Sequence, residues 1–236
     1  MSGQENPSFP PLLRGEETLP GMDPFAKAVA SAALGADPGL VCWARDAGAL
    51  RAALVLAPEE PLERAIGAVF AVALGLGDAL GALAPPEVAV HYVWPGGIKV
   101  NGADCGRLRA AAATSDPRAE PDWLVVGVEI PYLPQSGDDP GRRPDQTCLA
   151  EEGCIEVTPL KLLESWARHT LVWIHRFLDD GFAPLHAAWR ERAWEMGSEL
   201  PEGGLFVGID ELGGMLVKTA RTTELRPLTA LLEDLS

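Results

Sequence analysis

The feature that most constrains this chain is an apolar stretch before its middle. Residues 65–77 form a run of thirteen residues without one charged or hydrogen-bonding side chain. The run lies within residues 60–83, whose composition predicts one long helix that is apolar on almost every side and must therefore be buried. A membrane span needs about 20 apolar residues, whereas this run ends at Asp78. We therefore expect a core helix, surrounded by other elements, and no membrane span.

Length and charge narrow the classes of protein further. A chain of 236 residues with 47% hydrophobic content suggests one large domain with a small appendage, at about 150 residues per domain. It has 19 Lys and Arg against 34 Asp and Glu, a net charge of −15. This balance disfavours a nucleic-acid partner, whose phosphates need cations, and a membrane surface of anionic lipid. The first residues lack a basic start and an apolar signal core, which favours a cytoplasmic protein.

The cysteines and histidines indicate no metal site. The four cysteines form no CxxC pair and no Cys/His cluster, so neither a disulfide framework nor a zinc site is expected. His169 and His175 are six residues apart on one expected helix and cannot share a face.

Three regions follow from the pattern along the chain. Residues 1–20 hold four prolines and little periodicity, which predicts an extended arm. Residues 21–200 mix helices and strands without strict alternation, which predicts an α+β domain. Residues 201–236 read as a small β-domain, because two short strands flank a turn within 205–219. The expected helices are 23–34, 60–83, 158–181 and 182–196, and the expected strands are 39–43, 50–59, 88–94 and 123–130.

Local signals define two elements more closely. Thr158 can cap a helix, Pro159 fits its first turn and Gly181 can end it. Asn101-Gly102 is a strong hairpin signal between two short strands. The polar segment 135–146 is expected to be a mobile loop.

Four segments occur in an order typical of one known family. They are HYVWPGGIKVNGADCG (91–106), DWLVVGVEIPY (122–132), TCLAEEGCIEVTPLKLLESWARHTL (147–171), and GFAPLHAAWRER (181–192) followed by VGIDELGGMLV (207–217). From residue 50 onward the chain resembles the biotin protein ligase and lipoate protein ligase family. The resemblance implies a central mixed sheet with helices and a small C-terminal β-domain. It also implies ATP, biotin or lipoate as ligands, an acyl-adenylate intermediate, and a carrier domain whose lysine accepts the acyl group.

The departures from the family concentrate where the ligand would lie. The family's Arg/Gly-rich loop is reduced to ARDAGALR, with Arg45 and Arg51. Its KWPND motif reads VWPGG (93–97), and the lysine of its K-x-A-G motif falls on Ala103. Its G-x-G-x-N strand reads GVEIP (127–131). The expected ligand-binding residues, placed by the resemblance, are Trp94, Gly96, Gly97, Ala103, Gly106, Arg107, Leu108, Gly127 and Glu129.

Two residues are candidates for catalysis. Lys99 could replace the missing lysine, or it is a solvated lysine of the hairpin. Cys105 could be a nucleophile if nearby arginines lower the pKa of its thiol, or it is a small buried cysteine. We expect Ala103, Cys105 and Arg107 to lie along one face of their strand, since side chains alternate with a period of two.

Glu129 interrupts an apolar strand where an unpaired charge would be costly. It either pairs with Arg107 or Arg109 as part of the structure, or binds a cationic or hydroxylated ligand. His91 is expected to be a core or edge histidine, and Trp166, Trp173, Trp189 and Trp194 are expected to pack between elements.

Three functions remain open from the sequence. The first is a diverged acyl-adenylate or acyl-thioester transferase. The second is a non-catalytic module that binds a small carboxylate, a carrier domain or another protein partner. The third is a scaffold without a pocket, acting through its surface. Because the altered motifs remove the cations that phosphate would need, we expect no adenylate from biotin or lipoate. The acidic charge also disfavours acidic carrier domains.

Overall fold

The computed structural model describes residues 6–134 and 145–234, and the predicted loop 135–146 lies mostly outside them. Its strands are β1 (Arg14–Glu17), β2 (Leu40–Trp43), β3 (Ala49–Leu56), β4 (Val90–Val93), β5 (Gly97–Val100), β6 (Ala103–Ala112), β7 (Leu124–Pro131), β8 (Leu205–Ile209), β9 (Met215–Lys218) and β10 (Thr223–Arg226). Its helices are α1 (Pro24–Ala33), α2 (Leu62–Ala65), α3 (Ala68–Leu83), α4 (Pro159–Asp180), α5 (Ala183–Glu191) and the 3₁₀ turn η1 (Leu228–Leu231).

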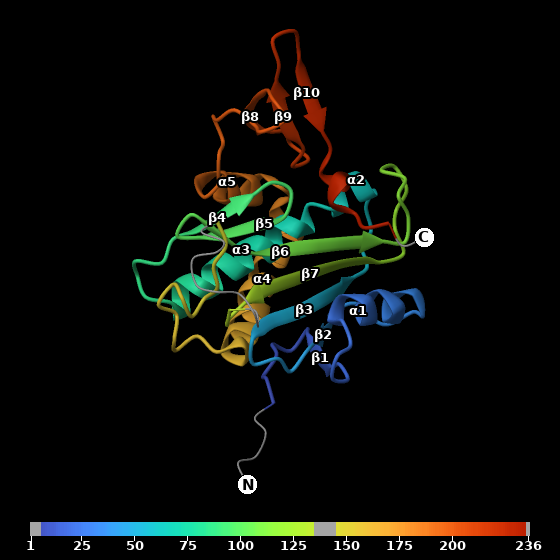
Figure 1. Ribbon diagram of the computed structural model, residues 1–236. Coiled ribbons are helices and arrows are strands. Elements are labelled where there is room, and N and C mark those ends of the chain that lie inside the picture. The colour runs from blue at the N-terminus through green and yellow to red at the C-terminus, as the bar shows by residue number, and fades with distance from the viewer. Residues whose placement is uncertain (1–5, 135–144, 235–236) are drawn as a thin grey trace.

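A seven-stranded mixed sheet in the order β1-β2-β3-β7-β6-β5-β4 forms the centre of the molecule (Figure 1). Only the β1–β2 pair is parallel among these described strands. Helix α1 packs on one face of the sheet, through a small cluster that includes Phe25 and Ala28. Helices α3 and α4 pack on the other face, over a larger core. The predicted α+β fold with a central mixed sheet is confirmed.

The apolar stretch forms the innermost helix, as expected, although the single helix predicted over 60–83 is wrong in detail. It is divided at Gly67, where an added Cβ would lie 3.0 Å from the ring of Phe182 and 3.2 Å from that of Phe177. Residues Leu62–Leu83 are long and apolar enough to cross a membrane by composition, but 78% of their most apolar window is buried inside the protein. Twelve of the sixteen residues of α3 are buried. The segment therefore serves as a core helix.

The helix after the loop has the predicted ends. The Thr158 hydroxyl accepts a hydrogen bond from the Lys161 N–H, Pro159 is the first residue, and Gly181 follows the last turn with φ 73°. Helix α5 is shorter than the predicted 182–196. The chain leaves the helix after Glu191 because it pairs with β4: Tyr92 N–H donates to the Arg192 carbonyl, and Trp194 N–H donates to the Tyr92 carbonyl.

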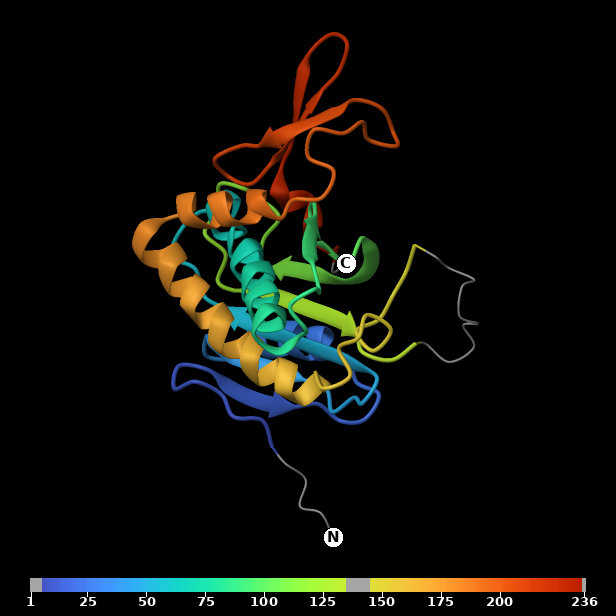
Figure 2. The ribbon, with the colours of Figure 1, turned by 90° about the vertical axis from the view of Figure 1, so that its left-hand side faces the viewer.

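The predicted arm contains a strand of the sheet. Residues 14–17 form β1 at its edge, paired with β2. At the other end of the chain, β8 and β9 form the predicted strand-turn-strand, and β10, which was not predicted, completes a separate three-stranded sheet. This sheet stands beyond the end of the main body in two views (Figures 1 and 2). The chain then returns to the central sheet, where Glu233 N–H donates to the Ala110 carbonyl.

Candidate functional site

Three of the residues predicted to surround the ligand, Arg107, Gly127 and Glu129, lie on the sheet face that carries α1, whereas Leu108 lies in the core on the other face. Arg51 of β3 and Arg107 of β6 are both opposite Glu129 of β7, and Gly127 is opposite Arg109. Directly opposed residues of antiparallel strands point to the same face. The structure therefore brings three arginines, Glu129 and Gly127 together, with Arg107 and Arg109 on the same face. We call this surface the α1 face.

Phe25, from the first turn of α1, fills the space above Gly127. A Cβ added to Gly127 would lie 2.6 Å from the Phe25 ring, so the glycine allows this ring to contact the sheet directly. The guanidinium of Arg109 lies 4.1 Å from the centre of the same ring, a favourable cation–π contact. Phe25 is buried. The glycine that the resemblance assigns to the ligand is thus covered by the chain's own side chain.

Arg109 is held by two carboxylates from distant parts of the chain. Its Nη1 donates to Asp23 Oδ2 at 2.7 Å, and its Nε and Nη2 donate to the two oxygens of Glu233 at 2.6 and 2.8 Å. Burial opposes ionisation of Asp23, but hydrogen bonds from Arg109 and the Phe25 N–H outweigh it and lower its pKa. The Arg109 hydrogen bond lowers the pKa of Glu233. Both carboxylates are therefore stabilised in the charged form.

The other arginines of the α1 face also have partners. Arg107 pairs with Glu129 at 3.2 Å, and Arg51 pairs with Asp46 at 2.9 Å. The Arg107 and Glu129 side chains are 64% and 39% exposed, so Glu129 is at the surface and has the arginine partner of the structural alternative. The cavity that remains among these residues holds only about 10 Å³. A single water molecule already needs about 10–15 Å³ by such a measure, so no small ligand fits here as the face stands.

The expectation that Ala103, Cys105 and Arg107 lie along one face is wrong. Between Gly97↔Arg107 and Lys99↔Asp104, two steps on β5 span three on β6, which is a β-bulge. Gly106 in the bulge has φ 125°, and a Cβ there would lie 2.2 Å from the Glu129 carbonyl oxygen. The bulge shifts the alternation by one residue, so Cys105 is buried in the helix-side core with Leu108, whereas Arg107 is on the α1 face.

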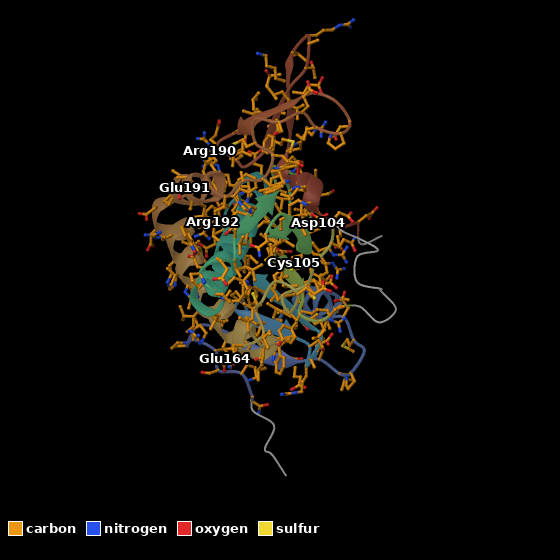
Figure 3. All side chains as sticks on the ribbon, turned by 60° about the vertical axis from the view of Figure 1, so that its left-hand side comes forward. Asp104, Cys105, Glu164, Arg190, Glu191 and Arg192 are labelled. Atoms are coloured by element: carbon orange, nitrogen blue, oxygen red, sulfur yellow. The ribbon has the colours of Figure 1, made fainter. Side chains whose placement is uncertain are left out.

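Cys105 lacks the environment of a reactive thiol. Its side chain is fully buried, and burial, together with nearby Cys148 and Glu152, raises its pKa. A thiolate is the reactive form. Figure 3 labels Cys105 beside Asp104 on β6, in the middle of the molecule and away from Glu164 on α4.

Lys99 and Trp94 have structural contacts. Lys99 Nζ lies 2.6 Å from Asp104 Oδ1 and 5.4 Å from the centre of the Trp194 ring. Trp194 also packs edge-on against His91, at 5.1 Å. Trp94 Nε1 donates to the Gly213 carbonyl at 2.9 Å, which attaches the small β-sheet to the main body. Three of the four late tryptophans are buried as expected, and Trp194 is half-buried.

Three further residues of the α1 face were not predicted: Asp23, Phe25 and Glu233. Asp23-Pro24 is a recognisable helix start, and Asp23 accepts a hydrogen bond from the Phe25 N–H. This signal could have placed α1 but not its contact with Arg109. Nothing in the spacing of the sequence connects residue 233 to residue 109.

Comparison with known proteins agrees with this architecture. The Biotin/lipoate A/B protein ligase family matches residues 9–191. A biotin--[acetyl-CoA-carboxylase] ligase of Paracoccus denitrificans is 28% identical over 184 residues, which cover 75% of this chain and 76% of that protein. Among solved structures, a biotin protein ligase-like protein of unknown function from Silicibacter sp. TM1040 is 49% identical, with a TM-score of 0.91 over 97% of this chain and 100% of that one.

More distant structures share the fold. A biotin protein ligase mutant of Aquifex aeolicus, solved in complex with biotin, is 18% identical with a TM-score of 0.70 and covers 92% of this chain and 96% of that one. The resemblance inferred from the four segments is thus confirmed, together with the mixed sheet and the small C-terminal sheet that it implied. The matched region extends over most of the sequence, and the chain belongs to the biotin/lipoate A/B protein ligase family.

Proposed function

We propose that this protein is a non-catalytic member of its family, which forms no acyl-adenylate and acts by binding a protein partner. One observation carries the proposal: the α1 face, where the resemblance places the ligand, is filled by Phe25 and by the Asp23–Arg109–Glu233 cluster. The chain has used the family's ligand surface for its own packing.

ATP, biotin and lipoate do not fit the α1 face as it stands. Binding and activating a phosphate requires donors or cations that are free to face it. Here Arg51, Arg107 and Arg109 each pair with a carboxylate of the chain. An anion would have to displace those carboxylates, and the body of an acid would have to displace Phe25. The same lack of room disfavours a small carboxylate alone as the ligand.

Transfer through a thioester is also unsupported. Cys105 is buried on the opposite side of the sheet from the arginines that were expected to activate it. Burial raises the pKa of its thiol, and the nearby Cys148, Glu152 and Cys154 raise it further, which opposes formation of the reactive thiolate.

The proposal is tested by acid-dependent pyrophosphate release from ATP and Mg²⁺, with biotin, lipoate or octanoate as the acid. The Paracoccus relative, with biotin, is the positive control. We expect no release above the acid-free rate. Phe25→Ala, which adds space but no cation, should be equally inactive. Acid-dependent release by the unmodified protein, with any of the three acids, would overturn the proposal.

A further inference from the structure

A large groove lies on the other side of the sheet from the α1 face. It holds about 600 Å³ between the second half of α4, the end of β3, the N-terminal arm and the β8–β9 turn. Its apolar walls include Leu54 and Leu56 of β3, Leu171, Ile174 and Leu178 of α4, and Leu12 of the arm. We call it the α4 groove. Figure 2 shows α4 crossing the sheet obliquely above the arm and β1.

One side of α4 lines this groove. Its lining residues Leu171, Ile174, His175 and Leu178 are spaced i, i+3, i+4 and i+7, the pattern of a face that packs against another element. Leu178 of α4 and Leu12 of the arm both line the groove and are 70% and 63% exposed. Large exposed aliphatic side chains around an open groove form the kind of patch that marks a binding site.

The charged residues around the groove are mainly acidic. Glu59, Glu60 and Glu211 line it, against the single cation Arg64 and His175. Within 6–134 and 145–234, none of the three carboxylates forms an ion pair. Glu60 is half-buried. Helix α4 ends in Asp179 and Asp180 with no basic residue in its last turn, where its dipole also favours a cation. The occupant should therefore be positively charged.

We propose that the α4 groove binds a cationic amphipathic helix of a protein partner, whose apolar side chains enter between Leu12 and Leu178. This inference rests on the proposed non-catalytic function and names the kind of partner. A helix fits because the groove lies beside α4, in the layer of helices that covers this face of the sheet. Packed helices in such a layer lie about 8–10 Å apart. Recognition of an amphipathic helix by an apolar groove is a common mode of binding.

Two other occupants are disfavoured by charge. A second copy of this chain brings a further net charge of −15. An anionic lipid surface would face the same carboxylates and be repelled.

The test uses the full chain and fluorescence anisotropy with labelled peptides of about 18 residues, long enough to form a helix. One peptide has Leu at i, i+3, i+4 and i+7 and Lys elsewhere. A second has Glu in place of Lys, and a third has the Leu/Lys composition scrambled. We expect saturable 1:1 binding of the first peptide, about tenfold tighter than the other two. Equal binding of the three, no binding of the first, or preference for the Glu peptide would overturn the inference.

Matched substitutions locate the binding. Leu178→Ser and Leu12→Ser should each weaken the Leu/Lys peptide about fivefold or more, because each removes an apolar anchor. Val172→Ser on α4 and Leu19→Ser on the arm are the controls, since Val172 and Leu19 are 57% and 70% exposed and lie outside the groove lining. All four positions are exposed, so folding should be preserved. Equal weakening by a test variant and its control would place the binding elsewhere.

The two proposals can fail separately. Acyl-adenylate formation would overturn the non-catalytic function even if the peptide binds in the groove. If the peptide test fails and no pyrophosphate is released, the inference of a helical partner in the α4 groove is overturned. The proposal that the protein forms no acyl-adenylate then still stands.

Discussion

The two sides of the central sheet differ in the pairing of their charged side chains and in the volume left open between side chains. On the α1 face, every arginine has a carboxylate partner, and about 10 Å³ remains among the side chains. In the α4 groove, about 600 Å³ is open and the lining carboxylates have no ion-pair partner among the described residues. A surface whose charged side chains form ion pairs with one another contributes to folding. A surface with unpaired carboxylates and apolar walls is available for binding. By this contrast the α4 groove, and not the face to which the family resemblance assigns the ligand, is the surface suited to binding.

The largest expected effect is the removal of Phe25. Its ring is buried between Gly127 and α1 and lies under the Arg109 guanidinium. Phe25→Ala should lower the free energy of unfolding by about 3–4 kcal/mol, as for other buried phenylalanines. Leu178→Ala in the α4 groove should change it by at most about 0.5 kcal/mol, because this side chain is mostly exposed. Urea unfolding monitored by circular dichroism measures both.

A loss below about 1 kcal/mol for Phe25→Ala would mean that the α1 face is not a packed unit. The face could then open for a ligand at little cost, and the contrast between the two sides would fail.

The second effect separates two arginines of the same strand. The Arg109 side chain is 21% exposed and binds two carboxylates, whereas Arg107 is 64% exposed and binds one. Arg109→Ala should cost about 2 kcal/mol, because it leaves Asp23 and Glu233 partly buried without a cation. Arg107→Ala should cost about 0.5 kcal/mol or less. Equal losses, measured by urea unfolding at the same pH, would contradict the view that Arg109 organises this face.

Most of the architecture was predictable because it depends on local signals. The cap at Thr158, the stop at Gly181 and the hairpin at Asn101-Gly102 each need only a few neighbouring residues, and all three occur as predicted. The order of four segments was enough to indicate the family fold. The strand β10 was missed because TELR has a weak period and is exposed at three of its four positions.

The site was less predictable because its contacts are not local. The bulge at Gly106 requires only one extra residue, yet it places Cys105 and Arg107 on opposite faces of the sheet instead of on the same face. The Asp23–Arg109–Glu233 cluster of the α1 face depends on a contact between Arg109 and Glu233, which are 124 residues apart in the sequence. The departures from the family motifs pointed to the surface around Gly127 and Glu129, but the residues that fill the α1 face come from the start of α1 and from the C-terminal tail.

The smallest effect concerns the sign of a pH dependence. Asp23 and Glu233 have lowered pKa values in the folded protein, from ordinary values of 3.8 and 4.5. Their contribution to stability is present above those values and is lost as the pH falls through the folded-state pKa values. Wild-type protein should therefore lose stability relative to Arg109→Ala as the pH falls below about 4.5.

Glu60, in the α4 groove, should show the opposite sign. Burial raises its pKa above 4.5, and the attraction of Arg64 offsets this only in part. The folded protein then holds a proton on Glu60 more tightly than the unfolded chain does, so the charged carboxylate slightly destabilises the fold at neutral pH. Glu60→Gln should raise the free energy of unfolding at pH 7 by about 0.3 kcal/mol, a small effect because Glu60 is only partly buried and solvent screens its charge. The gain should shrink as the pH falls below about 4.5, because the wild-type Glu60 carboxyl is then protonated in the folded and the unfolded state and is as neutral as the glutamine. A loss of stability for Glu60→Gln at pH 7 would show that its carboxylate already has a favourable partner. The groove would then be satisfied internally, as the α1 face is, and the difference between the two sides would be one of volume alone.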